Sequence, residues 1–317
     1  MKLFSPATRD DAVALVQSCT PTFDTAGQRT LFGAPSLERL FERGARRPEL
    51  VWAARPGQAA VGPGPDDAGL GLVGARTLSP SDGLIDLISL PDDPHVAEAL
   101  VGAATDWARS YGHVEASFDA PPSDVPLDEP ATRAVVAAFE AHGWRVLVTR
   151  KHYEHAPNAG LGEGVPPVGL EPAGLGGRSR VEAFVRQMLP GSLDVRDQAN
   201  LAERGLEAAA ADETESLLDG DPIEYFRFAV VDGQDAGLVV RRVMPSGNGY
   251  LSQVGVAQAF RGRGLARRLV AAGTRDLVAE GATTLIATTD DANWPMARAF
   301  IAAGWRQTES RVDLTLG

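Results

Sequence analysis

A strand, a turn and a helix follow one another in the run Val254-Gly255-Val256-Ala257-Gln258-Ala259-Phe260-Arg261-Gly262-Arg263-Gly264-Leu265-Ala266. The apolar residues before Ala257 end a strand, and the two glycines of the turn let the backbone approach a bulky group closely. The helix that begins here carries its apolar residues on one face. Because the first turn of a helix offers unpaired N–H groups and a partial positive charge, the segment predicts a phosphate or pyrophosphate site.

Four arginines crowd the start of this helix, where the helix dipole would favour acidic side chains. They are Arg261, Arg263, Arg267 and Arg268. This departure from a local rule favours a bound anion, the alternative being a solvated basic face in an arginine-rich chain. Two other phosphate motifs do not fit, because a dinucleotide fingerprint needs a third glycine where Arg267 stands and a Walker loop needs a lysine.

The sequence also contains an internal repeat. Residues 138–145 and 299–306 agree at six of eight positions, 161 residues apart, and both end in Gly-Trp-Arg. Upstream of each copy the pattern predicts a strand, a helix and a strand. The predicted ranges are 84–90, 94–110 and 114–118 in the first copy and 250–256, 262–280 and 283–289 in the second. We therefore predict two copies of one α/β unit, the alternative being chance similarity between Ala-rich segments.

A stretch rich in glycine and proline, residues 156–177, is predicted to be a linker between the copies. The predicted domains are therefore residues 1–156 and 157–317. The second copy is expected to begin with a long helical region, residues 179–218. A hairpin follows, with strands at 225–231 and 237–243 and the turn Asp232-Gly233-Gln234-Asp235.

Composition excludes several classes of protein. The net charge of −12 and pI near 4.9 argue against a general nucleic-acid binder. No apolar run approaches the roughly 18 residues of a membrane span, and the N-terminal segment does not resemble a signal peptide. Cys19 is the one cysteine of the sequence, so no internal disulfide can form. We expect a cytoplasmic protein with no membrane or nucleic-acid partner.

The six residues from Arg261 to Ala266, after a strand, resemble the Arg/Gln-x-x-Gly-x-Gly/Ala motif of the GNAT superfamily of acyl-CoA-dependent N-acyltransferases. Asn293, Phe300 and Gly304-Trp305 are similar to that family's Asn, Tyr and Gly-Phe pattern on the next helix. The resemblance covers residues 168–316. It implies an α/β fold of the α+β type: two tandem GNAT-like domains, each with a mixed, mostly antiparallel central sheet flanked by helices.

The resemblance also implies a site for acetyl-CoA, the acyl donor. Its pantetheine arm would lie along the strand, and the N–H near Val254 would polarise the thioester carbonyl, an oxyanion-type role. Its pyrophosphate would rest on the amides that follow Arg261. The expected cofactor-binding residues are Val254, Gly255, Val256, Arg261, Gly262, Arg263, Gly264, Leu265, Ala266, Asn293 and Phe300.

The chain departs from the family pattern in its catalytic groups. Phe300 stands where many members carry a Tyr that protonates the leaving thiolate, and a phenyl ring cannot donate a proton. The predicted strand 250–256 contains no acid, so Glu224 and Asp290, with Asp291 beside it, are the candidate general bases. All five histidines lie in the first copy, so the second has no His-based triad, and no metal site is predicted.

The first copy is predicted to be a degenerate GNAT-like domain with a structural or substrate-binding role. Its helix starts with Asp92-Asp93-Pro94, and acids there suit the bare helix dipole and would repel a phosphate.

The predicted function is transfer of acetyl from acetyl-CoA to a primary amine by direct attack in a ternary complex. The acidic balance favours a small cationic acceptor such as an amino sugar, a polyamine or an amine-bearing antibiotic, but protein N-termini and thiol-precursor amines remain open. One alternative is a non-catalytic acyl-CoA binding or sensing protein, and another is a scaffold that binds no cofactor. The chain could be a monomer or a homodimer.

Overall fold

The computed structural model describes residues 2–55, 70–162, 164–174 and 176–317. The chain forms two compact units. Unit 1 comprises Met1–Thr149 with Glu309–Gly317, and unit 2 comprises Arg150–Thr308. No helix within the described ranges combines the length and apolarity that crossing a membrane requires.

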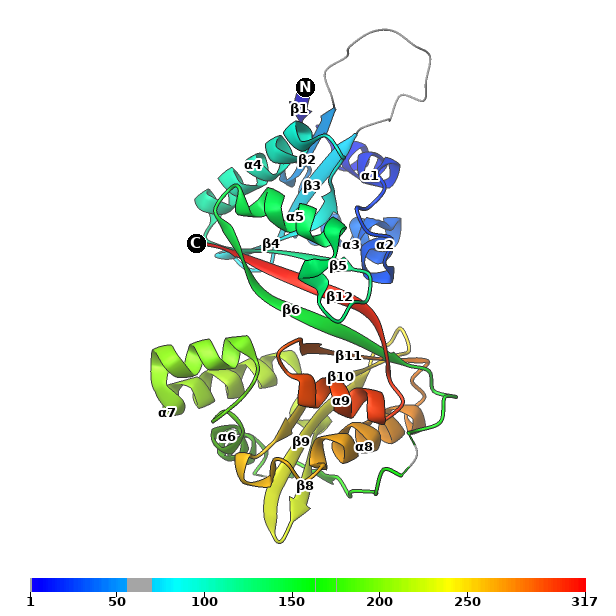
Figure 1. Cartoon of the computed structure of the whole chain (residues 1–317), viewed down its shortest axis with the longest axis vertical. Coiled ribbons are helices and arrows are strands. Elements are labelled where there is room, and N and C mark those ends of the chain that lie inside the picture. The colour runs from blue at the N-terminus through cyan, green and yellow to red at the C-terminus, as the bar shows by residue number, and fades with distance from the viewer. Residues whose placement is uncertain (1, 56–69, 163, 175) are drawn as a thin grey trace. The chain divides into compact units, whose positions relative to one another are not determined.

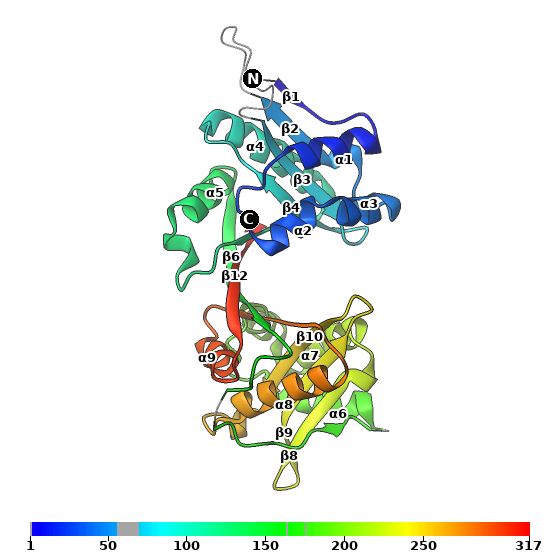
Figure 2. The same ribbon diagram turned by 90° about the vertical axis from the view of Figure 1, so that its right-hand side faces the viewer.

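Unit 1 is built on one sheet whose strands follow the order β1-β2-β3-β4-β5-β12. The strands are β1 (Lys2–Phe4), β2 (Val51–Arg55), β3 (Gly71–Thr77), β4 (Asp82–Ser89), β5 (His113–Ala120) and β12 (Arg306–Leu316). Figure 2 shows the helices of this unit in two groups, one on each side of these strands. The first group is α1 (Arg9–Ser18), α2 (Ala26–Phe32) and α3 (Ala34–Glu42), and the second is α4 (Pro94–Tyr111) and α5 (Pro130–Glu140).

Unit 2 repeats this plan with the strand order β6-β11-β10-β9-β8-β7. The strands are β6 (Trp144–His155), β7 (Glu171–Pro172), β8 (Phe226–Val231), β9 (Gln234–Val243), β10 (Asn248–Val256) and β11 (Thr284–Asp290). The helices are α6 (Gly177–Met188), α7 (Val195–Gly220), α8 (Leu265–Ala279) and α9 (Trp294–Ala302). In Figure 1, α6 and α7 lie on one side of the strands and α8 on the other.

The predicted fold class is confirmed, because each unit has a mixed sheet flanked by helices. Among the strand pairs described within the units, only β4–β5 and β10–β11 are parallel. Each predicted strand and helix of the two repeats is present with its ends moved by at most three residues. The hairpin turn is tighter than expected, because Asp232 and Gly233 both take positive φ and β9 begins directly after them at Gln234. The predicted helical region 179–218 is two helices, and Gly205 (φ 75°, ψ 169°) breaks the second.

The internal repeat is visible in the packing as well as in the sequence. In unit 1, the indole of Trp144 donates to Thr105 Oγ1 at 2.8 Å, and that hydroxyl donates to the Val101 carbonyl. In unit 2, Trp305 donates to Thr274 Oγ1 at 2.9 Å, and Thr274 donates to the carbonyl of Val270. The Gly-Trp ending of each repeat therefore ties the last strand of that copy to the long helix in the same way.

The two units are not the two halves of the sequence. Residues 309–316 of β12 and the following Gly317 belong to unit 1, where Ser310–Thr315 pair with Glu115–Ala120 of β5. Residues 150–155 of β6 belong to unit 2, where they pair with β11. The division into compact units therefore differs from the predicted boundary at 156/157. The physical reason is that each sheet is completed by a strand from the other half of the chain.

Candidate functional site

The parallel strands β10 and β11 of unit 2 are hydrogen-bonded over only part of their length. β10 and β11 pair only over Asn248–Tyr250 and Thr284–Ile286, although the strands continue to Val256 and Asp290. We call the region beyond the paired residues the β10–β11 split. A split of this kind exposes strand backbone that can take hydrogen bonds from a bound ligand.

The backbone of β10 turns two valines toward the split. Ala257 N–H donates to the Ala236 carbonyl of β9, and neighbouring residues of an antiparallel strand alternate between facing that partner and facing away. Val254 and Val256 therefore direct their N–H and C=O groups away from β9. A bulge between Leu251 and Gln253 sets this phase.

The loop after β10 is open on its outer side. Gly262 and Gly264 have φ of 76° and 72°, and a Cβ at either position would meet no atom within 4 Å. Gly264 directly precedes α8, and no side chain caps the helix. Among the turn and capping hydrogen bonds described for the chain, none is donated by the amides of residues 262–266. The predicted anion-binding features, free amides and room above them, are therefore present together.

The arginines of this loop have different roles. The Arg261 guanidinium donates to the carbonyls of Val256 (3.2 Å), Pro190 (2.7 Å) and Gly191 (2.8 Å) and also to that of Met188. Burial disfavours the charged guanidinium, and it lowers the pKa of Arg261 more than the charge of Asp197 raises it. The Arg261 side chain is thus bound to protein carbonyls and not directed into the open space above the loop.

The other three arginines are less constrained. The Arg263 guanidinium lies 5.2 Å from the ring centre of Phe260 and is exposed. Arg268 donates to the Pro167 carbonyl at 2.8 Å, while its Nε and that of Arg267 are buried and have no partner among the described residues. These cations keep hydrogen-bonding capacity at the start of α8.

The next helix places two predicted residues differently. Asn293 precedes α9 and its Oδ1 accepts from the Met296 N–H at 3.3 Å, so the amide is a helix cap beside the end of β11. Phe300 is 2% exposed, stacked on Tyr153 at 5.0 Å and packed edge-on against Trp305 at 5.3 Å. The Phe300 ring is therefore part of the core of unit 2.

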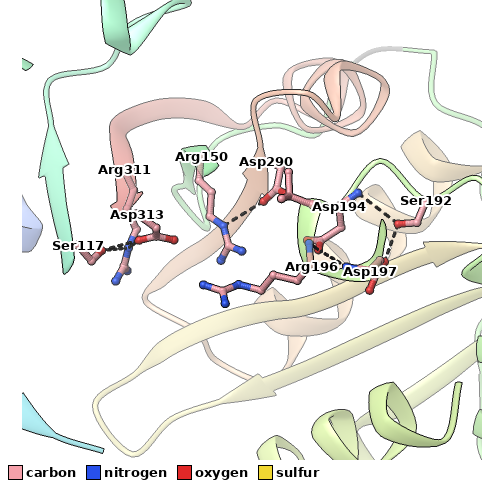
Figure 3. A network of polar contacts seen from close by, with 10 residues as sticks. Ser117, Arg150, Ser192, Asp194, Arg196, Asp197, Asp290, Arg311 and Asp313 are labelled. Carbon is pink, nitrogen blue, oxygen red and sulfur yellow. Dashed lines mark hydrogen bonds and ion pairs between the residues drawn. The ribbon is translucent and has the colours of Figure 1, made fainter. Parts of the chain in front are cut away.

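The candidate bases occupy unlike positions. Glu224 is exposed in the 3-10 turn η3 (Ile223–Tyr225) before β8, and β9 lies between β8 and β10. Asp290 ends β11 at the split and is 3% exposed. Its Oδ1 pairs with Arg150 Nε at 3.0 Å (Figure 3). Its Oδ2 accepts from the Val195 N–H at 2.9 Å. Burial raises the pKa of the Asp290 carboxyl, while the Val195 amide lowers it. Its neighbour Asp291 is paired with Lys151 at 3.1 Å.

Sequence reasoning missed a group of carboxylates near the start of α7. Asp194 caps α7, and Ser192 donates to Asp197 at 2.5 Å (Figure 3). Burial raises the pKa of Asp197 to about 6, an effect that the Ser192 hydroxyl opposes. Burial, with the charges of Asp197 and Asp194, raises the pKa of Glu213 to about 8. No motif marks these residues, because burial and mutual repulsion, not spacing, make them unusual.

The corresponding region of unit 1 is arranged differently. Asp93 caps α4 and accepts from the His95 N–H at 3.0 Å, so a carboxylate of the chain occupies that helix start. On β5 and β12, Arg311 donates to Ser117 at 2.7 Å, and Ser117 donates to Asp313 at 2.6 Å (Figure 3). Unit 1 therefore has ionic and hydrogen-bonded groups here, without the glycine loop of unit 2.

Comparison with known proteins shows a similarity in the second half of the chain. Residues 193–305 match the model of the acetyltransferase (GNAT) family. No match is found among curated proteins.

Solved structures share the fold of the whole chain. A GCN5-related N-acetyltransferase from Sphaerobacter thermophilus is 16% identical with a TM-score of 0.59, covering 99% of this chain and 94% of that one. A tandem GNAT protein from the clavulanic acid biosynthesis pathway is 16% identical with a TM-score of 0.52, covering 99% and 98%. An acetyltransferase of the GNAT family from Colwellia psychrerythraea is 14% identical with a TM-score of 0.50 and full coverage of both chains.

Proposed function

We propose that unit 2 transfers an acetyl group from acetyl-CoA to a primary amine, because residues 193–305 match the model of the acetyltransferase (GNAT) family. The observation that carries the proposal is the uncapped start of α8. Its two glycines with positive φ leave open space and free amides beside the β10–β11 split. A diphosphate joined to an extended arm fits a site that combines helix-start amides with an unpaired strand edge.

The residues of unit 2 suit acetyl-CoA in three places. The amides of residues 262–266 would bind the pyrophosphate, with Arg263 and Arg267 supplying positive charge. Val254 and Val256 would bind the pantetheine arm through their backbone groups, and Asn293 at the start of α9 would contact the same arm. Acetyl-CoA supplies the activated acyl group as a thioester, and no metal is required for that chemistry.

The reaction follows from these positions. The amine nitrogen attacks the thioester carbon, the carbon–sulfur bond breaks, and the amine loses one proton. The Val254 N–H would stabilise the oxyanion that develops on the carbonyl oxygen. Since Phe300 is buried and has no hydroxyl, a thiolate would leave without a proton from that position, as the moderate pKa of a thiol permits. We retain Asp290 as the proposed proton acceptor in preference to Glu224, because Asp290 ends β11 at the split.

The acidic residues at the start of α7 favour a cationic acceptor. Asp194 and Asp197 bring two carboxylates to the start of α7, next to Asp290, which is paired with Arg150. An ammonium group would be attracted to them before it is deprotonated. The proposed acceptor is therefore a small molecule with at least one primary amine.

The first experiment is calorimetric titration of the full chain with acetyl-CoA. We expect one site per chain, abolished by Gly264→Asp, which adds strain at φ 72° and a charge that repels phosphate. Gly281→Asp is the matched control, since Gly281 also has positive φ and open surroundings at the other end of α8. An amine panel read by free-thiol release then tests turnover.

Each outcome of the titration has a definite meaning. Two sites would contradict the degenerate role proposed for unit 1. Binding without release of thiol on any amine would favour a non-catalytic acyl-CoA sensor, for which the buried Phe300 already argues. Absence of binding would overturn the transferase proposal and leave a scaffold.

A further inference from the structure

The turn between α6 and α7 spans the β10–β11 split. On one side, Met188 at the end of α6 lies on β10, where a Cβ at Gly255 would be only 2.2 Å from its Sδ atom. On the other side, α7 begins at Val195, whose N–H donates to Asp290 at the end of β11. Residues 189–194 therefore bridge the ends of the two separated strands, as a wall over the split.

Arg261 binds this wall to the loop that precedes α8. Its guanidinium reaches the carbonyls of Met188, Pro190 and Gly191 on the turn and that of Val256 at the end of β10. A guanidinium is planar, always charged and has five N–H donors in fixed directions, so it can link several carbonyls at once. Arg261 lies 70 residues from Gly191 in the sequence, so this is a tertiary link between separate segments.

The turn bound by Arg261 leads directly into the acidic residues at the start of α7. Ser192 accepts from the Asp194 N–H at 3.2 Å and donates to Asp197 at 2.5 Å, so these residues move with the turn (Figure 3). Displacing residues 189–191 would therefore displace Asp194 and Asp197, the carboxylates proposed to attract the amine.

We propose that Arg261 is a positioning residue for the acceptor: it holds the 189–194 wall, with Asp194 and Asp197, in register with the cofactor loop. This inference rests on the proposed function of unit 2. If Arg261 bound the phosphates of the cofactor directly, its replacement would lower the affinity for acetyl-CoA. If Arg261 is a positioning residue, its replacement instead displaces the turn and raises the KM for the acceptor at saturating acetyl-CoA.

Two substitutions reach the link from opposite sides. Arg261→Gln removes the guanidinium from the loop. Gly191→Ala acts from the turn, because a Cβ there would lie 3.1 Å from Arg261 Nη1 at a φ of 68°. We expect each to raise the acceptor KM tenfold or more while the Kd for acetyl-CoA changes less than threefold. The double variant should be no worse than Arg261→Gln alone, because both break one link. Arg261→Lys, which restores the charge with fewer fixed donors, should recover part of the loss.

Matched controls separate the link from local strain and lost charge. Arg275→Gln removes an exposed arginine of α8 to which no role is assigned, and Gly205→Ala adds a methyl at a positive φ in α7 with no atom within 4 Å. Neither should raise the acceptor KM as Arg261→Gln does. A fall in acetyl-CoA affinity that parallels the rise in KM would overturn the proposal, as would additive effects in the double variant.

Hydrogen exchange of the ligand-free chain provides a readout that does not depend on turnover. The amides of residues 191–197 should exchange faster in Arg261→Gln than in the native chain and at the native rate in Arg275→Gln. If the native chain fails to bind acetyl-CoA but this pattern holds, the proposed function fails and the mechanical link stands. Unchanged exchange in Arg261→Gln would overturn the link itself.

Discussion

Replacing Glu213 by Gln should stabilise unit 2 in a pH-dependent way. Glu213 has a pKa of about 8 in the folded chain against 4.5 for the free side chain, chiefly because it is buried. The folded state therefore holds a proton that the unfolded state has lost at neutral pH. The contribution of Glu213 to the free energy of unfolding is fully present below pH 4.5 and is lost as the pH rises from there through 8.

The size of the effect follows from the two pKa values. Linkage gives a cost of about 1 kcal/mol at pH 5, about 3 kcal/mol at pH 7 and about 4 kcal/mol at pH 8 for native Glu213. Gln has a similar shape and does not titrate. The difference in unfolding free energy between Glu213→Gln and the native chain should therefore grow by about 3 kcal/mol between pH 5 and pH 8.

Denaturant unfolding at fixed ionic strength across this pH range measures the difference. Glu203→Gln is the control, because Glu203 is exposed on the same helix and its replacement removes the same charge. The difference in unfolding free energy should grow more with pH for Glu213→Gln than for this control. The explanation by burial would be refuted if the two variants gave the same pH profile, or if Glu213→Gln destabilised the chain at pH 8.

Two further outcomes follow from the packing of the units. Thr105→Val and Thr274→Val each leave a buried indole N–H without its acceptor. Each should therefore lower the unfolding free energy of its own unit by about 1–3 kcal/mol. An unchanged unfolding free energy in denaturant unfolding would contradict the paired Trp–Thr hydrogen bonds. Deleting residues 309–317 removes the partner of β5, including the fully buried Val312 and Leu314. The amides of unit 1 should then lose hydrogen-exchange protection while those of β8 and β9 keep it, and loss confined to unit 2 would show that the strand belongs there.

The local features of the site could be predicted from sequence because they depend on neighbouring residues. Two glycines before an apolar helix predicted the open loop, and both have the positive φ that favours glycine. The repeated Phe and Gly-Trp predicted two equivalent units, and Phe139 and Phe300 pack on Trp144 and Trp305 alike. These short-range patterns predicted two α/β units, and the family resemblance of the glycine loop implied the mixed, mostly antiparallel sheet of each.

The features that were missed depend on residues far apart in the chain. Arg261 was assigned with its neighbouring arginines to the anion, but its guanidinium is bound to a turn about 70 residues earlier. Glu213 reads as an ordinary polar residue of an Ala-rich helix, and only tertiary burial changes its pKa. The partner of β12 was not predictable either, because the alternating pattern of a strand indicates which face is buried but not which strand lies beside it.

The last strand of unit 1 affects how the protein can be made. During synthesis, residues 1–149 leave the ribosome about 160 residues before 309–317. Until residues 309–317 emerge, one edge of β5 has no partner strand, and the apolar residues that β12 covers stay exposed. Unit 2 has all of its strands once residue 308 has emerged, and unit 1 does not. The domain that is translated first is therefore the one that is completed last.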